Sequence, residues 1–174
     1  MAKGIGAVDK EIPKWFAVRT RFKWEKKAAE NLQNAAIEVY LPLYEKVKHY
    51  EKVIKRTILP LIPNYLFVKI VKDEYTTVLK QEGVMGFLHN HGNLNAIPEQ
   101  EIEILRRFNG EWEDLEVIEG RWDKGTPVKI VSGPLVGYEG KVVEEQGKTK
   151  VFISLETMGH TLKVIIDRQN LYKL

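Results

Sequence analysis

The C-terminal part of the chain alternates apolar and polar residues, and this pattern constrains the fold more than any other feature. Between residues 123 and 174, apolar side chains recur at every second position in several short runs. Turns are expected at Gly133-Pro134, Gly147-Lys148 and Gly159-His160, where glycine gives the backbone the freedom a tight turn needs. Several short strands in so short a segment predict a small, closed or nearly closed β-barrel.

Residues 14–110 mix strand-like and helix-like periodicity, which indicates an α+β fold. The predicted order is β-α-β-β-α-β-α, a ferredoxin-like split unit with one added helix. Strands are expected over residues 15–21, 37–47, 64–71 and 84–88; helices are expected over 23–36, from an Asp73 cap to about Gln81, and after Pro98.

Charge divides the chain into the same parts. Residues 1–110 carry a net charge of +5, residues 111–122 of −4, and residues 123–174 of +2, within a total of +3. A basic unit and a second unit separated by an acidic segment suggest two domains and a linker. The predicted organisation is a loose leader over 1–13, an N-terminal domain over 14–110, an acidic linker over 111–122 and a barrel over 123–174.

Nothing in the sequence forms a convincing catalytic or metal-binding constellation. Cysteine is absent, and His89 and His91 have no third ligand at a useful spacing. No apolar run reaches the roughly 20 residues that a membrane-spanning helix needs. We therefore expect a cytoplasmic, monomeric, non-enzymatic protein without cofactor, metal or membrane contact.

Several motifs resemble the NusG family of transcription elongation factors. The pattern V-x-I-x-x-G-P-L-x-G-x-x-G-x-V from Val128 to Val142 is similar to a KOW motif, and WFAVRT, LIPNYLFVKI and GVMGF resemble the family's N-terminal domain. The resemblance covers residues 14–174. It implies an α+β N-terminal domain, a flexible linker and an SH3-like KOW barrel. The basic stretch from Glu45 to Thr57 resembles specialised, RfaH- or UpxY-like members that serve selected operons.

The resemblance implies binding to the clamp helices of RNA polymerase. Tyr65 and Phe67 alternate with Leu66 and Val68 along one strand, and we expect the two aromatics to form an exposed patch. In the family, the start of the helix after Asp73 faces the polymerase gate loop. The residues implied in polymerase binding are Leu61, Pro63, Tyr65, Phe67, Phe87, Ile97, Thr76 and Thr77.

Two basic groups are candidates for nucleic-acid contact, including the non-template DNA strand, because lysine and arginine bind phosphates. They are Arg19, Arg21 and Lys23, and, in a polar stretch over residues 44–57, Lys46, Lys48, Lys52, Lys55 and Arg56. An alternative stays open: RNA-recognition modules share this topology and stack bases on strand aromatics, and ribosome-associated proteins also carry KOW motifs.

The barrel is expected to recruit a separate partner. Met158 falls near a partner-contacting residue of the family, whose barrels meet a small-subunit ribosomal protein or the termination factor Rho. Taken together, the sequence predicts a non-catalytic factor that binds RNA polymerase and suppresses pausing or termination at selected operons.

Overall fold

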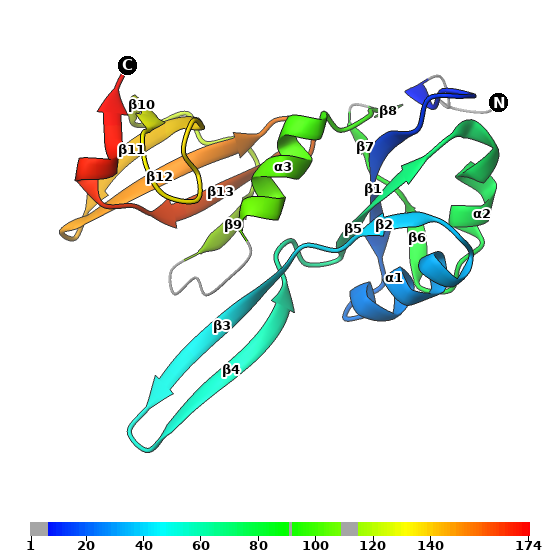
Figure 1. The fold of residues 1–174 in the computed structure, drawn as a ribbon, viewed down its shortest axis with the longest axis horizontal. Helices are drawn as coiled ribbons and strands as arrows, with labels where there is room; N and C mark the ends of the chain where they lie inside the picture. The colour runs from blue at the N-terminus through cyan, green and yellow to red at the C-terminus, as the bar shows by residue number, and fades with distance from the viewer. Residues whose placement is uncertain (1–6, 91, 109–114) are drawn as a thin grey trace.

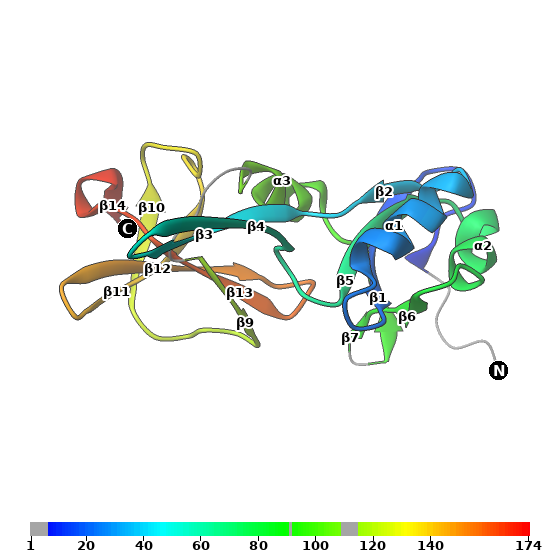
Figure 2. The same cartoon turned by 90° about the horizontal axis from the view of Figure 1, so that it is seen from below.

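The fold consists of two β-sheet units with a helix between them and a long hairpin that projects from the N-terminal unit (Figure 1). The computed structural model describes residues 7–90, 92–108 and 115–174. Seen from below, helix α3 again lies between the two sheets (Figure 2). Among the described residues, no helix is long and apolar enough to cross a membrane.

The N-terminal sheet has four antiparallel strands in the order β2-β5-β1-β6. Its order along the chain confirms the predicted β-α-β-β-α-β-α arrangement. The elements are β1 (Lys14–Thr20), α1 (Glu25–Asn34), β2 (Glu38–Tyr40), β5 (Tyr65–Ile70), α2 (Tyr75–Leu79), β6 (Val84–Phe87) and α3 (Glu99–Arg107).

Helix ends follow local chemistry. Pro98 precedes α3, whose first turn holds Glu99 and Glu101 and whose last turn is basic, a distribution that complements the helix dipole. The prediction that Asp73 caps helix α2 is wrong. The carboxylate of Glu74 instead accepts a hydrogen bond from the Val71 N–H at 2.9 Å, because Glu74 lies three residues after it.

Strand alternation gives the N-terminal sheet two different faces, as predicted. The helix face consists of Phe16, Val18, Leu66, Val68 and Ile70, which pack with the buried side of α1 and α2. The aromatic face consists of Trp15, Ala17, Tyr65, Phe67 and Lys69, and its apolar members belong to a second core that also contains residues of α3 and the barrel.

The C-terminal sheet confirms the predicted barrel-like unit and adds strands to it. Its order is β14-β10-β11-β12-β13-β9. Gln146 and Gly147 both have positive φ, 52° and 74°, as a tight hairpin turn requires. At Gly140, a Cβ would lie 2.7 Å from the Phe152 carbonyl oxygen, so only glycine fits between β11 and β12. The strands are β9 (Glu116–Glu119), β10 (Thr126–Ile130), β11 (Glu139–Glu145), β12 (Lys148–Leu155), β13 (His160–Ile165) and β14 (Leu171–Lys173), with the 3-10 turn η3 (Arg168–Asn170) before β14.

Several segments differ from expectation. The polar stretch over 44–57 is a regular hairpin of β3 (Leu43–Tyr50) and β4 (Val53–Pro60). Residues 116–119, expected in the linker, form β9 and pair with β13. Val8, expected in a loose leader, is buried in the helix-face core. Residues 1–6, His91 and the first part of the expected linker lie outside the described residues. The remaining short elements are η2 (Lys72–Glu74), β7 (His89–Asn90) and β8 (Asn93–Leu94).

Candidate functional site

Three aromatic rings form the centre of the aromatic face. Tyr40 of β2 stacks on Phe67 of β5 with ring centroids 6.2 Å apart, and Trp15 of β1 meets Tyr40 edge-on at 6.3 Å. The guanidinium of Arg106, from α3, lies 5.6 Å from the centroids of both Trp15 and Tyr40. Stacked rings with a cation above them are a favourable arrangement, so α3 is held to the sheet by its charged side as well as its apolar side.

Glu99 connects this ring cluster to α3. Its carboxylate accepts hydrogen bonds from Trp15 Nε1 at 2.9 Å and from Arg106 at 3.1 Å, and Lys69 Nζ lies 3.9 Å away. Burial raises the pKa of Tyr40 to about 12, with Arg106 partly opposing this rise. The Tyr40 hydroxyl has no hydrogen-bond partner among the described residues. The ring cluster is therefore well packed, but one of its polar groups, the Tyr40 hydroxyl, lacks a hydrogen-bond partner among the described residues.

The barrel packs on the other side of α3. Glu101 Oε1 accepts a hydrogen bond from the Thr157 N–H at 3.0 Å, and Arg107 donates one to the Val136 carbonyl oxygen at 3.2 Å. Arg107 also lies 5.1 Å from the ring centroid of Tyr138. Burial raises the pKa of Glu101, although the bonds from Thr157 oppose the rise. The contact between α3 and the barrel thus depends on a few polar groups around an apolar centre.

A second contact joins the barrel to the strand that carries the aromatics. The ring of Tyr65 meets that of His160, at the start of β13, edge-on with centroids 5.7 Å apart. A cavity of about 330 Å³ opens beside this pair and is also lined by Arg19 and by Val117 and Glu119 of β9. The barrel therefore covers one end of the aromatic face directly, without α3 in between.

The prediction that Tyr65 and Phe67 form an exposed apolar patch is wrong in this structure. Phe67 is 0% exposed, and Leu61 and Ile97 are also buried in the same core, while Tyr65 is half-buried. They are covered because α3 and the barrel fold over the aromatic face, and both elements come later in the sequence. Phe87 is on the other side of the sheet, where it stacks on Tyr75 in the helix-face core.

The remaining residues implied in binding lie away from this cluster. Pro63 and Thr76 are exposed, and Thr77 is half-buried on α2, beside the helix face. The structure therefore does not bring the threonines together with Tyr65 and Phe67. The eight basic residues predicted to contact nucleic acid are all exposed: Arg19, Arg21, Lys23, Lys46, Lys48, Lys52, Lys55 and Arg56.

Met158, the predicted partner contact of the barrel, is also covered. It is 4% exposed and belongs to the core that α3, the barrel and the aromatic face share. Its burial follows from the turn after β12, where Thr157 is hydrogen-bonded to Glu101 of α3. Leu61, Tyr65, Phe67 and Ile97 of the N-terminal unit and Met158 of the barrel therefore share one core, whereas the other residues implied in binding lie outside it.

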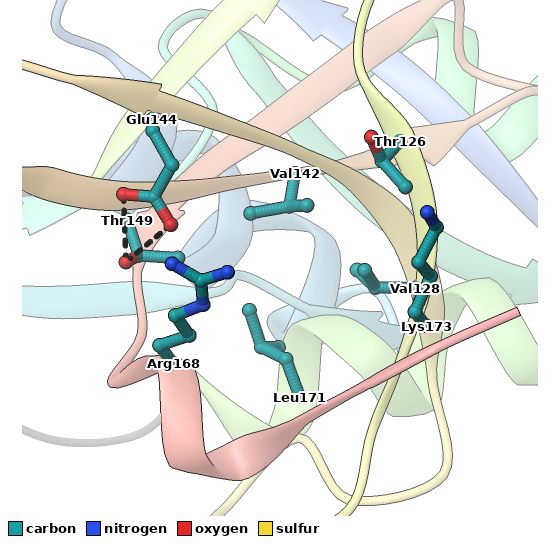
Figure 3. A pocket seen from close by; sticks show the side chains of 8 residues that line it. All are labelled: Thr126, Val128, Val142, Glu144, Thr149, Arg168, Leu171 and Lys173. Carbon is teal, nitrogen blue, oxygen red and sulfur yellow. Dashed lines mark hydrogen bonds between the residues drawn. The ribbon is translucent and has the colours of Figure 1, made fainter.

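The barrel has a separate pocket of about 300 Å³ near η3 and β14, with no residue of α3 in its lining (Figure 3). Glu144 points into it and accepts hydrogen bonds from the Thr149 hydroxyl at 3.0 and 3.1 Å (Figure 3). Arg168 and Lys173 line the same pocket. Within the described ranges, no three histidine or acidic side chains gather as metal ligands.

Sequence reasoning missed Trp15, Tyr40, Glu99, Glu101 and Arg106. A usable signal existed on α3, because Glu99 and Arg106 are seven residues apart and therefore lie on one side of a helix. Trp15 and Tyr40 gave no such signal, since their contact depends on β1 and β2 flanking β5 in the sheet.

Comparison with known proteins agrees with this architecture. Residues 13–106 match the family model "NusG: Transcription termination factor nusG". A Streptococcus pyogenes serotype M3 protein, "Transcription termination/antitermination protein NusG", is 26% identical, with 81% of this chain and 86% of the relative covered. The Thermus thermophilus protein of the same name is also 26% identical, with coverage of 91% and 97%.

A solved structure described as "Domain interaction in Thermotoga maritima NusG" has the same fold. Its TM-score is 0.59 at 21% identity, and the match covers 93% of this chain and 97% of that one. The family model spans more than half of the sequence, including every strand of the N-terminal sheet. The chain belongs to the NusG family.

Proposed function

We propose that this NusG-family protein is a non-catalytic transcription elongation factor that binds RNA polymerase and suppresses pausing or termination. The observation that carries the proposal is the aromatic face, together with the family match. Tyr65 and Phe67 lie on the side of the sheet that the helices α1 and α2 leave uncovered. Large aromatic side chains in a packed patch are the usual anchors of protein interfaces.

Binding to polymerase through this face requires both the barrel and α3 to move away from it, because both cover the aromatic residues. Tyr65 is covered by His160, and α3 is held to the barrel by Glu101 and Arg107. The polar part of this contact is small and partly exposed to solvent, and its apolar part is the core that α3, the barrel and the sheet share. If the closed arrangement dominates in solution, the apparent polymerase affinity is reduced by the fraction of molecules that are open.

The test compares two variants of the full-length protein for binding to purified core RNA polymerase. Tyr65→Ala removes a half-buried ring, and we expect a loss of at least ~2 kcal/mol, or roughly 30-fold in Kd. Arg107→Ala combined with His160→Ala weakens the barrel contact, so we expect tighter apparent binding. Met85→Ala, at a 63% exposed position of β6, is the matched control.

Both variants must keep the circular dichroism spectrum of the wild type for the comparison to hold. Unchanged affinity of a folded Tyr65→Ala protein would remove the aromatic face as the polymerase site. Weaker binding by the Arg107→Ala/His160→Ala protein would mean that the barrel contact assists polymerase binding instead of opposing it.

The threonines of α2 are proposed to act separately from the aromatic face. Thr76 is exposed, and both hydroxyls lie on a short helix at the other side of the sheet (Figure 1). A Thr76→Ala/Thr77→Ala protein is expected to bind polymerase normally and to lose its antipausing effect in a single-round elongation assay. Normal antipausing by this variant would exclude the proposed gate-loop contact.

Two further proposals concern nucleic acid and the choice of operons. The alternative of base stacking on Tyr65 and Phe67 is less favoured, because the one lysine of the aromatic face, Lys69, lies 3.9 Å from the Glu99 carboxylate and leaves little positive charge for RNA phosphates. We propose instead that the exposed basic residues contact nucleic-acid phosphates.

We also propose that the protein is a specialised elongation factor that acts at few operons, and that its barrel binds a ribosomal protein or Rho. Genome-wide occupancy of the protein on RNA polymerase tests the first point, because uniform occupancy would indicate a general elongation factor.

A further inference from the structure

The pocket near η3 and β14 is built entirely by the barrel. Its eight lining residues come from β10, β11, β12, η3 and β14 (Figure 3). Met158 and the aromatic face belong instead to the core that the barrel shares with α3. Packing of the barrel against α3 therefore does not fill this pocket. At about 300 Å³ it has the size of a small ligand site, a kind of site found in the mouths of β-barrels.

The middle of the pocket is apolar. Val128 of β10 is 3% exposed, and Val142 of β11 and Leu171 of β14 are half-buried and pack against the barrel core. These three side chains lie between the polar groups of the pocket in Figure 3 and form its floor. An apolar side chain of a ligand that covered this floor would be removed from water, which favours binding.

Polar groups lie at both ends of the floor (Figure 3). Lys173 and the Thr126 hydroxyl are at one end, and Arg168 lies at the other end beside Glu144 and Thr149. Glu144 accepts hydrogen bonds from the Thr149 hydroxyl at 3.0 and 3.1 Å. Within the described part of the chain, the side chains of Arg168 and Lys173 have no ion-pair or hydrogen-bond partner. Both cations are therefore available to a ligand.

The charges of the lining indicate which ligand fits. Arg168 and Lys173 contribute two positive charges and Glu144 one negative charge, so the pocket has a net charge of +1. A ligand with one negative charge complements this pocket better than a zwitterion, which has none to spare. Because Glu144 offsets Arg168, the anionic group belongs at the Lys173 end. The other end offers donors and an acceptor together, which match the C=O and N–H of a peptide group.

We propose that this pocket binds the C-terminal end of a partner polypeptide whose last residue is apolar. The terminal carboxylate binds Lys173 and the Thr126 hydroxyl through charge-assisted hydrogen bonds. The last side chain covers the apolar floor, and the preceding peptide group lies between Arg168 and Glu144. Capture of a C-terminal carboxylate is one of the general modes of peptide recognition. This site is separate from the polymerase contact and from the partner contact proposed at Met158.

The experiment titrates the isotope-labelled full-length protein with the peptide acetyl-Gly-Ser-Leu, which has a free carboxylate, and follows backbone amide resonances by NMR. We expect saturable shifts at Val142, Glu144 and Leu171, which line the pocket. The C-terminally amidated peptide carries no negative charge and should bind at least about tenfold more weakly. Acetyl-Gly-Ser-Gly keeps the carboxylate but lacks the apolar side chain, so it should also bind at least about tenfold more weakly.

Four substitutions at exposed positions test the two ends of the pocket. Lys173→Gln removes the carboxylate contact, and we expect about a fivefold loss, because an exposed ion pair is screened by water. Arg168→Gln should cost only about twofold, since Glu144 already offsets this charge. Glu144→Gln keeps an acceptor and makes the pocket more positive, so peptide affinity should stay equal or rise. Lys129→Gln, on β10 but outside the lining, is the matched control and should leave the affinity unchanged.

Several results would overturn the proposal. Equal binding of the acid and the amide would exclude the carboxylate contact, and an equal loss from Lys129→Gln and Lys173→Gln would show that only net charge matters. Free leucine or acetate binding as tightly as the peptide would make the site one for amino acids or for any carboxylate. Shifts centred on Met158 would place the peptide elsewhere.

Polymerase binding is measured in parallel with the same variants. Lys173→Gln should weaken peptide binding and leave polymerase binding unchanged, whereas Tyr65→Ala should do the converse. Failure of the polymerase proposal would therefore leave the peptide result intact. Loss of both activities in Lys173→Gln would overturn the separation of the two sites.

Discussion

The two faces of the N-terminal sheet use the same strands but are covered in different ways. Leu66 and Val68 point to the helix face, where short-range elements of the same domain bury them completely. Tyr65 and Phe67 point to the aromatic face, where α3 and then the barrel cover them. The helices α1 and α2 cover the helix face with apolar residues. The elements that cover the aromatic face carry charged residues at their edges and are distant in sequence.

This difference suits the helix face to stabilising the domain and the aromatic face to binding a partner. A face made only of apolar side chains gains most from being removed from water. A face made of aromatic rings, a lysine and a buried tyrosine hydroxyl offers both apolar area and polar handles to a partner. We therefore expect substitutions on the helix face to unfold the domain, and substitutions on the aromatic face to change which surface covers it.

The largest expected effect is on the helix face. Leu66→Ala removes a fully buried side chain and leaves a cavity, so the free energy of unfolding should fall by about 3 kcal/mol. Urea denaturation of the full-length protein measures this change. Met85→Ala, in the same sheet but exposed, should change it by less than ~0.5 kcal/mol. Similar losses from the two substitutions would contradict the division between the faces.

A smaller effect is expected at Glu101, between α3 and the barrel. Its pKa is raised in the packed structure because burial disfavours the charged carboxylate. A raised pKa means that the packed arrangement binds the proton more tightly than the opened one. Protonation of Glu101 therefore stabilises the packed arrangement. This stabilisation is fully present below the ordinary glutamate pKa of 4.5 and is lost as the pH rises through the raised pKa.

The Thr157 amide resonance reports this equilibrium in NMR spectra, because its N–H donates to Glu101. On lowering the pH from neutral, we expect the resonance to move toward its packed position. Glu101→Gln mimics the neutral acid, so its shift should be packed-like and independent of pH in this range. In Glu139→Gln, a change at an exposed site on β11, the Thr157 resonance should shift with pH as it does in the wild type. A pH-dependent shift that persists in Glu101→Gln would assign the effect to another group.

Sequence patterns were sufficient for the helix face and for most of the barrel. The alternation from Tyr65 to Ile70 correctly divided the strand between two faces, and the turn at Gly147 was expected because both neighbouring runs alternate. These features depend on local periodicity, which a single sequence carries. The family resemblance was likewise confirmed by the match over residues 13–106.

The burial of the aromatic face by elements distant in sequence could not be predicted from local patterns. Phe67 was expected to be exposed, because nothing near it in sequence announces that α3 and His160 fold over its strand. Strand β9 was missed because its acidic residues, Glu116 and Glu119, suggested a linker, although an edge strand accommodates charge readily. The hairpin was missed because the turn between its strands, at Glu51-Lys52, lacks a glycine turn signal.

The smallest expected effect tests the polar side of the aromatic face. The Tyr40 hydroxyl is buried without a hydrogen-bond partner among the described residues, and the pKa of this group is raised to about 12 by burial. Removing an unsatisfied polar group while keeping the ring is nearly neutral or stabilising. Tyr40→Phe should therefore leave the free energy of unfolding unchanged or raise it by up to ~1 kcal/mol, as measured in urea. Trp15→Phe is the contrasting variant, because it removes the Nε1–H that Glu99 accepts and should be destabilising. A Tyr40→Phe protein less stable than Trp15→Phe would mean that the hydroxyl has a partner in solution, and that the aromatic face is as fully satisfied as the helix face.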